Sequence, residues 1–140
     1  MIPNLANFFE TIVQGASDAI VYADEDGVIR FWNRGAERIF GHSAAEAIGR
    51  SLDIIIPEPL RARHWDGYRL VMKTGVTRYG EGELLAVPGV RKSGERISLE
   101  FTIVPFHGQD SRMCGIGAIL RDVTKRFEEL KQLRRQVATR

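Results

Sequence analysis

The sequence predicts an α+β domain whose helices lie on one side of an antiparallel sheet. Two β-rich runs near the start are followed by short helical segments and one longer helix, and three further strand-like runs come last. Strands joined by short turns pair antiparallel, and helices grouped together in such a chain pack on one face of the sheet. The order of the elements therefore indicates the fold class before any motif is considered.

An amphipathic helix and a hairpin open the chain. Residues 5–13 place large apolar side chains at helical spacing, so one face of this helix is apolar. Residues 19–33 contain two β-rich runs around a turn that ends in Asp26-Gly27, a pair that favours tight hairpin turns. These two runs are predicted to be the first strands of the sheet.

Two short helices and a longer one are predicted next. Asn33 can cap a helix over residues 34–40, and residues 43–49 have the pattern of a second capped helix. The longer helix covers residues 60–74, and its inward stripe contains one histidine among apolar and aromatic side chains: Leu60, His64, Tyr68 and Val71. The residues alone leave two interpretations of this histidine open, a core imidazole or a ligand to something bound inside the domain.

The second half of the chain is predicted to be mainly β. Strands are expected over residues 79–90, 96–106 and 113–124, and strict alternation in the second puts four apolar side chains on one face: Ile97, Leu99, Phe101 and Ile103. A charged helix over residues 125–140 follows, with one narrow apolar stripe: Phe127, Leu130, Leu133 and Val137.

Composition and charge exclude several classes of protein. The chain has 140 residues, of which 44% are hydrophobic and 27% charged, as in one ordinary globular domain. Its 20 basic and 18 acidic residues are dispersed, so we expect no nucleic-acid partner. We expect a cytoplasmic location without membrane contact, because no apolar run reaches the ~18 residues of a span and the first residues do not resemble a signal peptide. The single cysteine, Cys114, excludes an internal disulfide, and we find no catalytic constellation and expect no enzyme.

The order of elements and several short words together resemble the PAS sensory domain. The words are DAIVYADEDGVIRFWNRGAERIFG, AIGRSL, IIPE, RKSGERISLEFTI and RDVT, and the resemblance covers about residues 15–125. It implies a five-stranded antiparallel sheet with short helices on one face, and a cup between the two that can hold a cofactor. Residues 1–14 are then an amphipathic helix before the PAS domain, and residues 126–140 are a signalling helix after it.

Two short words distinguish between the known types of PAS domain: one differs from the flavin-binding type, and the other matches the heme-binding type. Flavin-binding PAS photoreceptors carry a reactive cysteine in a GRNC word; here the word is GRSL, with Leu52 at that position, so no flavin adduct is expected. Heme-binding PAS domains of the bacterial FixL and Dos oxygen-sensor types place their iron-binding histidine on the long helix, in the Dos type at the end of a word IPxxLRxxH. Residues 56–64, IPEPLRARH, match that word and put His64 at the ligand position. Beyond it the similarity continues only if Trp65 is treated as a one-residue insertion.

The resemblance also implies a heme b pocket with His64 as its metal ligand. The walls would come from the long helix and the facing strands: Leu60, Tyr68, Leu99, Phe101, Ile103, Ile116, Ala118 and Leu120. Cations near the helix could pair with the carboxylate arms of a porphyrin: Arg61, Arg63, Arg69 and Arg78. The distal arginine of the FixL type falls on Leu84 or Leu85, and the distal methionine of the Dos type on Gly82 or Glu83. Neither distal group is present, so ligand preference does not carry over.

Two functions of different classes follow from these features. The first is a heme-based sensor of a diatomic gas or of redox state; the second is a PAS module that binds another small ligand, or none, and acts through dimerisation or protein interaction. In either case we expect a homodimer formed through the amino-terminal helix and the sheet, and an output domain or partner reached through the carboxy-terminal helix. Asp122 and Thr124 would form the junction to that helix. His42 and His107 lie in predicted turns and are expected to be exposed to solvent.

Overall fold

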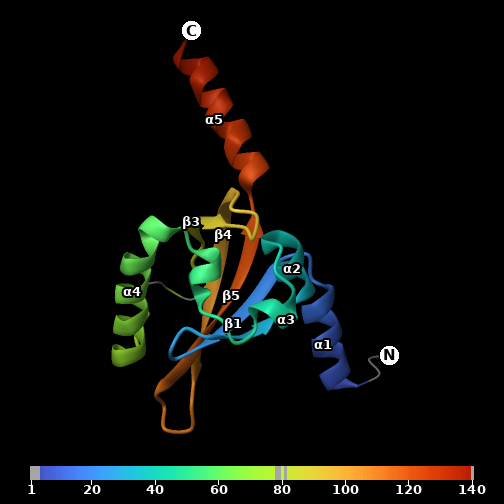
Figure 1. Ribbon diagram of the computed structural model, residues 1–140, viewed down its shortest axis with the longest axis vertical. Helices are drawn as coiled ribbons and strands as arrows, with labels where there is room; N and C mark the ends of the chain where they lie inside the picture. Colours follow the sequence, from blue (N-terminus) through green and yellow to red (C-terminus); the bar gives the residue numbers. More distant parts are fainter. Residues whose placement is uncertain (1–3, 78–79, 81, 140) are drawn as a thin grey trace.

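Five antiparallel strands form a single sheet in the order β2-β1-β5-β4-β3 in the computed structural model, which describes residues 4–77, 80 and 82–139 (Figure 1). The strands are β1 (Ala19–Asp24), β2 (Ile29–Trp32), β3 (Leu85–Val90), β4 (Arg96–His107) and β5 (Met113–Asp122). The central strand β5 pairs with β1 and β4, so the last strand in the sequence joins the amino-terminal hairpin to the carboxy-terminal one. The predicted α+β class and five-stranded sheet are confirmed.

Most helical segments come between β2 and β3. They are α2 (Arg34–Phe40), α3 (Ala44–Ala47), two 3₁₀ turns η1 (Leu52–Ile55) and η2 (Glu58–Leu60), and α4 (Arg61–Thr74). The remaining helices, α1 (Leu5–Gly15) and α5 (Thr124–Ala138), lie at the two ends of the chain. Figure 1 shows α2 and α3 in front of β1 and β5, α4 to one side, and α5 projecting away from the domain.

Asn33 ties α1, β1 and α2 together. Its side-chain oxygen accepts hydrogen bonds from the backbone N–H of Ile20 and, as the cap of α2, from that of Ala36. Its amide nitrogen donates to the carbonyl oxygens of Val13 and Asp18. The side chain is fully buried, so these bonds satisfy groups that have no access to water. The sequence predicted the cap but not the other three bonds.

One face of the sheet carries the core. Residues that pair across the strands share this inner face, as Val21 of β1 does with Ala118 of β5, and Ala118 with Ile103 of β4. The core comprises this face and the side chains that α2, α3 and η1 pack on it: Ala19, Val21, Ile29, Trp32, Ala36, Phe40, Ala47, Ile55, Ile97, Leu99 and Leu120. The short helices therefore cover one end of the inner face.

Two local predictions differ from the structure. The strand predicted over residues 79–90 begins at Leu85, and residues 79 and 81 lie outside the described part. His42 is buried, with 6% of its surface exposed, because it lies beside Trp32, whose indole N–H donates to its carbonyl oxygen. His107 is exposed, as predicted. Sequence patterning could not find the burial of His42, because it depends on a contact with Trp32 of β2 rather than on local polarity.

Candidate functional site

Helix α4 is held against the β1–β2 turn by two aromatic side chains. The indole N–H of Trp65 donates to Asp53 Oδ1 at 2.7 Å, and the far edge of the indole lies over Gly27. The hydroxyl of Tyr68 donates to the carbonyl oxygen of Asp24 at 2.5 Å. Tyr68 is buried, and burial raises the pKa of its hydroxyl, so this donor stays protonated. Trp65, an insertion by sequence, is thus a docking residue of this helix.

His64 contacts both of these aromatic residues, and the three rings form a triangular cluster. Its ring centroid is 4.7 Å from that of Trp65 and 5.7 Å from that of Tyr68. Burial lowers the pKa of the imidazole, and the carboxylate of Asp53 opposes that shift only in part, so the ring is neutral at pH 7. The Nδ1 atom is buried and makes no hydrogen bond within the described part of the chain. A neutral imidazole with an unpaired nitrogen is the form that binds a metal.

The inner face of the sheet is less well covered where α4 lies beside it than under the short helices. Leu99 and Leu120, two of the predicted wall residues, are buried in the core, and four others are half-buried: Phe101, Ile103, Ile116 and Ala118. Phe101 pairs with Leu120, and Ile103 with Ala118, so they continue the same apolar face. On α4, Tyr68 is buried, and Leu60 is half-buried at the preceding 3₁₀ turn. A sheet face of this kind can still bury apolar surface against a ligand.

Of the predicted cations that the structure describes, Arg61 and Arg69 are not brought together around His64. Arg69 is exposed and pairs with Asp66 on its own helix at 3.2 Å. Arg61 donates from Nε to the carbonyl oxygen of Ile56 and lines a different cleft, because its backbone lies where η2 turns into α4. Arg78 lies outside the described residues. A role for Arg69 in holding a porphyrin carboxylate is therefore not supported.

Leu84 does not belong to the predicted site. It precedes β3 and is 61% exposed. Leu85 is the residue that reaches the inner face, since it pairs with Phe101. Side chains alternate between the two faces along a strand. Placing the distal position at Leu84 instead of Leu85 therefore moves it from the inner face of the sheet to the outer one.

The junction between β5 and α5 is bonded to the sheet. Asp122 Oδ1 accepts from the backbone N–H of Thr124 at 3.0 Å, and Thr124 Oγ1 accepts from the N–H of Ser98 at 2.9 Å. The N–H of Val123 donates to the carbonyl oxygen of Ser98, which lies next to Leu99 on β4. Ser98 was not foreseen from the sequence, since its role depends on the pairing of β4 with β5.

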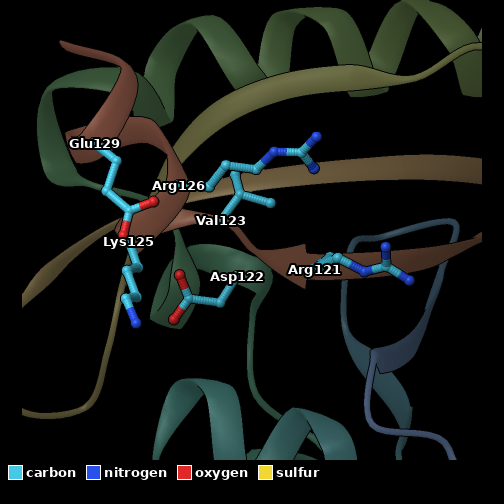
Figure 2. A pocket seen from close by; sticks show the side chains of 6 residues that line it. All are labelled: Arg121, Asp122, Val123, Lys125, Arg126 and Glu129. Carbon is cyan, nitrogen blue, oxygen red and sulfur yellow. The ribbon is translucent and has the colours of Figure 1, made fainter. Parts of the chain in front are cut away.

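An open cleft lies beside this junction. It measures about 370 Å³ and is lined by charged side chains of both signs and by Val123 (Figure 2). Figure 2 shows the guanidinium of Arg121 directed away from Lys125 and Glu129. Arg121 forms a two-bond ion pair with Asp18, at 3.0 and 3.1 Å, so the end of β5 is also tied to the start of β1.

Comparison with known proteins identifies the family. Residues 13–128 match the family model described as the PAS fold. The chain belongs to the PAS family. The predicted family is therefore confirmed over most of the chain, and members of this family are, as a rule, sensory rather than catalytic modules.

Sensor proteins are among the sequence relatives of this PAS domain. The sensor protein FixL of Bradyrhizobium diazoefficiens is 34% identical over 93 residues, which are 66% of this chain and 18% of that protein. The oxygen sensor protein DosP of Escherichia coli (strain K12) is 27% identical over 135 residues, or 93% of this chain and 16% of that protein. This PAS domain thus spans less than a fifth of the length of these relatives.

Solved structures share the fold. The PAS domain of a protein from Colwellia psychrerythraea has a TM-score of 0.72 and 23% identity, covering 87% of this chain and 99% of that one. An RNA-binding light-oxygen-voltage receptor has a TM-score of 0.75 and 23% identity over 99% of this chain and 39% of that one. No described helix of this PAS domain is long and apolar enough to cross a membrane. No described cluster of three or more histidine, cysteine or acidic residues could hold a metal ion.

Proposed function

We propose that this PAS domain is the sensory module of a longer bacterial protein and binds heme b in its cup, with His64 as the ligand to the iron. Heme would supply an iron that binds a diatomic gas or changes redox state. Residues 15–125 would be the sensor, residues 1–14 a dimerisation helix, and residues 126–140 the connection to an output domain or partner. The cytoplasm is the expected location.

The proposal depends mainly on the protonation and hydrogen bonding of the His64 ring. The residue closes the heme-type word of residues 56–64, and its ring is neutral, with a buried nitrogen that makes no hydrogen bond in the described part of the chain. Such an atom is costly to bury unless something pairs with it. The half-buried apolar side chains on the inner face fit the flat apolar body of a porphyrin. The chemistry of the donor and the walls therefore fits heme.

The residues at the distal positions would decide which gas a bound heme prefers. Residues 82–85 are Gly, Glu, Leu and Leu, without an arginine or methionine. If heme is bound, oxygen at its iron would need a hydrogen-bond donor from the protein more than carbon monoxide would. We therefore expect the ferrous protein to bind carbon monoxide readily and to hold oxygen weakly.

Hemin titration followed by visible absorption tests the proposal. The purified protein should take up one equivalent and develop a Soret band, and His64→Ala should weaken hemin affinity at least tenfold. His107→Ala, at an exposed position, is the matched control and should behave as the unmodified protein. If His64→Ala leaves the spectra unchanged and lowers only the free energy of unfolding, by about 1–3 kcal/mol, the histidine is a core residue.

The ring cluster of α4 supports a second candidate function. His64 packs against both Trp65 and Tyr68, an arrangement that a core imidazole can also adopt without any cofactor. In that case the domain would bind another small ligand, or none, and act through dimerisation and protein contacts. Unchanged spectra in the hemin titration would favour this function.

The proposed homodimer rests on the apolar face of α1. Phe8, Phe9 and Ile12 are exposed, although α1 is fixed to the core through the bond from Asn33 to Val13. Exposed apolar groups this large on a fixed helix favour a partner surface. Light scattering at tens of micromolar should give twice the monomer mass, and Phe9→Glu should restore the monomer. A monomeric unmodified protein would exclude this interface.

A further inference from the structure

A strongly basic cleft adjoins the aromatic cluster around His64 at Asp53 but is not lined by the histidine itself. It measures about 360 Å³ and is bounded by the α2–α3 connection, the segment before and within η1, the start of α4 and the end of β3. Its lining residues are His42, Arg50, Asp53, Ile54, Arg61, Val90, Arg91 and Lys92. Four cationic side chains thus meet a single carboxylate.

The negative partners at the cleft are already engaged. Asp53 accepts the indole N–H of Trp65 at 2.7 Å, and Arg61 lies 4.0 Å from the same carboxylate oxygen. Lys92 pairs with Glu46 on α3. Among the described residues, neither Arg50 nor Arg91 makes a side-chain hydrogen bond or ion pair, so both guanidinium groups are free to bind an anion.

His42 supplies a buried polar group at the same cleft. It is 6% exposed, and neither ring nitrogen makes a hydrogen bond within the described part of the chain. Burial lowers the pKa of the ring, and the charges of Arg50 and Lys92 lower it further, whereas Glu46 and the backbone of Ile54 act in the opposite direction. The imidazole is therefore neutral and retains one N–H donor.

We infer that this cleft binds a small organic phosphate, with Arg50 and Arg91 pairing with its oxygens and His42 donating a hydrogen bond from a ring nitrogen. Guanidinium groups bind phosphate oxygens through paired N–H donors, and a dianion is the charge that several converging cations favour. The volume exceeds that of a lone phosphate and leaves room for a small organic group. This site does not use His64 and does not depend on heme.

Two-dimensional NMR at constant ionic strength tests the inference, with phenyl phosphate, inorganic phosphate and acetate as probes. Phenyl phosphate should shift the His42 ring signals and the amides of residues 50–54 and 90–92 in a saturable manner. Arg50→Gln and Arg91→Gln should each weaken binding at least fivefold. Arg69→Gln, which removes an exposed arginine outside the cleft, should leave the affinity within twofold.

Three results would overturn the inference. Shifts that do not saturate, or an equal loss of affinity in Arg69→Gln and Arg91→Gln, would mean general screening of charge rather than a site. Tighter binding of acetate than of phenyl phosphate would overturn the assignment to phosphate. Since Arg50 is exposed and Arg91 half-buried, both variants should fold, and their thermal melts provide the check.

Discussion

Substituting Gly27 by alanine should undock α4 from the hairpin. Gly27 has φ +76°, and a Cβ built on it would overlap Cη2 and Cζ3 of the Trp65 ring. The ring cannot swing aside freely, because its N–H is bonded to Asp53. The left-handed backbone costs alanine about 1–2 kcal/mol, and overpacking adds roughly 1–3 kcal/mol. We therefore expect Gly27→Ala to lower the free energy of unfolding by roughly 2–5 kcal/mol.

Gly49 provides a matched control for the backbone contribution. It also has a positive φ, +94°, but a Cβ there would meet nothing within 4 Å. Urea denaturation should give a loss of about 1–2 kcal/mol for Gly49→Ala. In a Trp65→Leu background, the cost of Gly27→Ala should fall toward that of the control, because the ring that it meets is gone. Equal losses for Gly27→Ala and Gly49→Ala, or a cost that Trp65→Leu leaves unchanged, would refute the packing argument.

Three further predictions concern pH, the buried asparagine and the junction. The unfolded chain binds a proton at His64 below about pH 6.5, whereas burial holds the native ring neutral to a lower pH, so stability should fall as the pH drops below that value. His64→Leu should make the urea-denaturation profile between pH 7.5 and 5 less steep, while His42, whose pKa burial also lowers, keeps part of the slope; an unchanged profile would contradict this. Asn33→Ala should lower the free energy of unfolding by roughly 2–4 kcal/mol. Asn4→Ala, which removes an exposed cap, should cost about 1 kcal/mol or less. Equal losses would argue against a stabilising role for the buried hydrogen bonds of Asn33. Alanine at both Asp122 and Thr124 should loosen α5 in spin-label distance measurements while ligand affinity in the cup is retained, and an unchanged distance distribution would exclude a junction role.

Local patterns predicted most elements of this PAS domain. The capping residues Asn33 and Ser43 begin α2 and α3 as expected, and the alternation of β4 placed Leu99 on the core face. The inward stripe of α4 was also predicted correctly, with Tyr68 buried and His64 half-buried. These features depend on neighbours within one or two helical turns or along one strand, which the sequence shows directly.

Other features depend on contacts between distant segments. The docking of Trp65 over Gly27, the burial of His42 beside Trp32 and the bond of Ser98 to Thr124 each join residues that are not adjacent in the chain. The partners of Arg61 and Arg69 could not be predicted for a related reason. Long side chains take the partner that lies within reach, so Arg69 pairs with Asp66 and Arg61 turns toward the carbonyl of Ile56.

The short connection between sheet and tail makes α5 a lever. Val123 alone separates the end of β5 from the first residue of the helix, and its N–H is held by Ser98 of β4. A helix of 15 residues is about 22 Å long at 1.5 Å per residue, so a tilt of about 5° at its base moves its tip by about 2 Å. A twist of β4 and β5 too small to disturb their pairing would therefore reach Ala138 as a displacement large enough to break or make side-chain contacts.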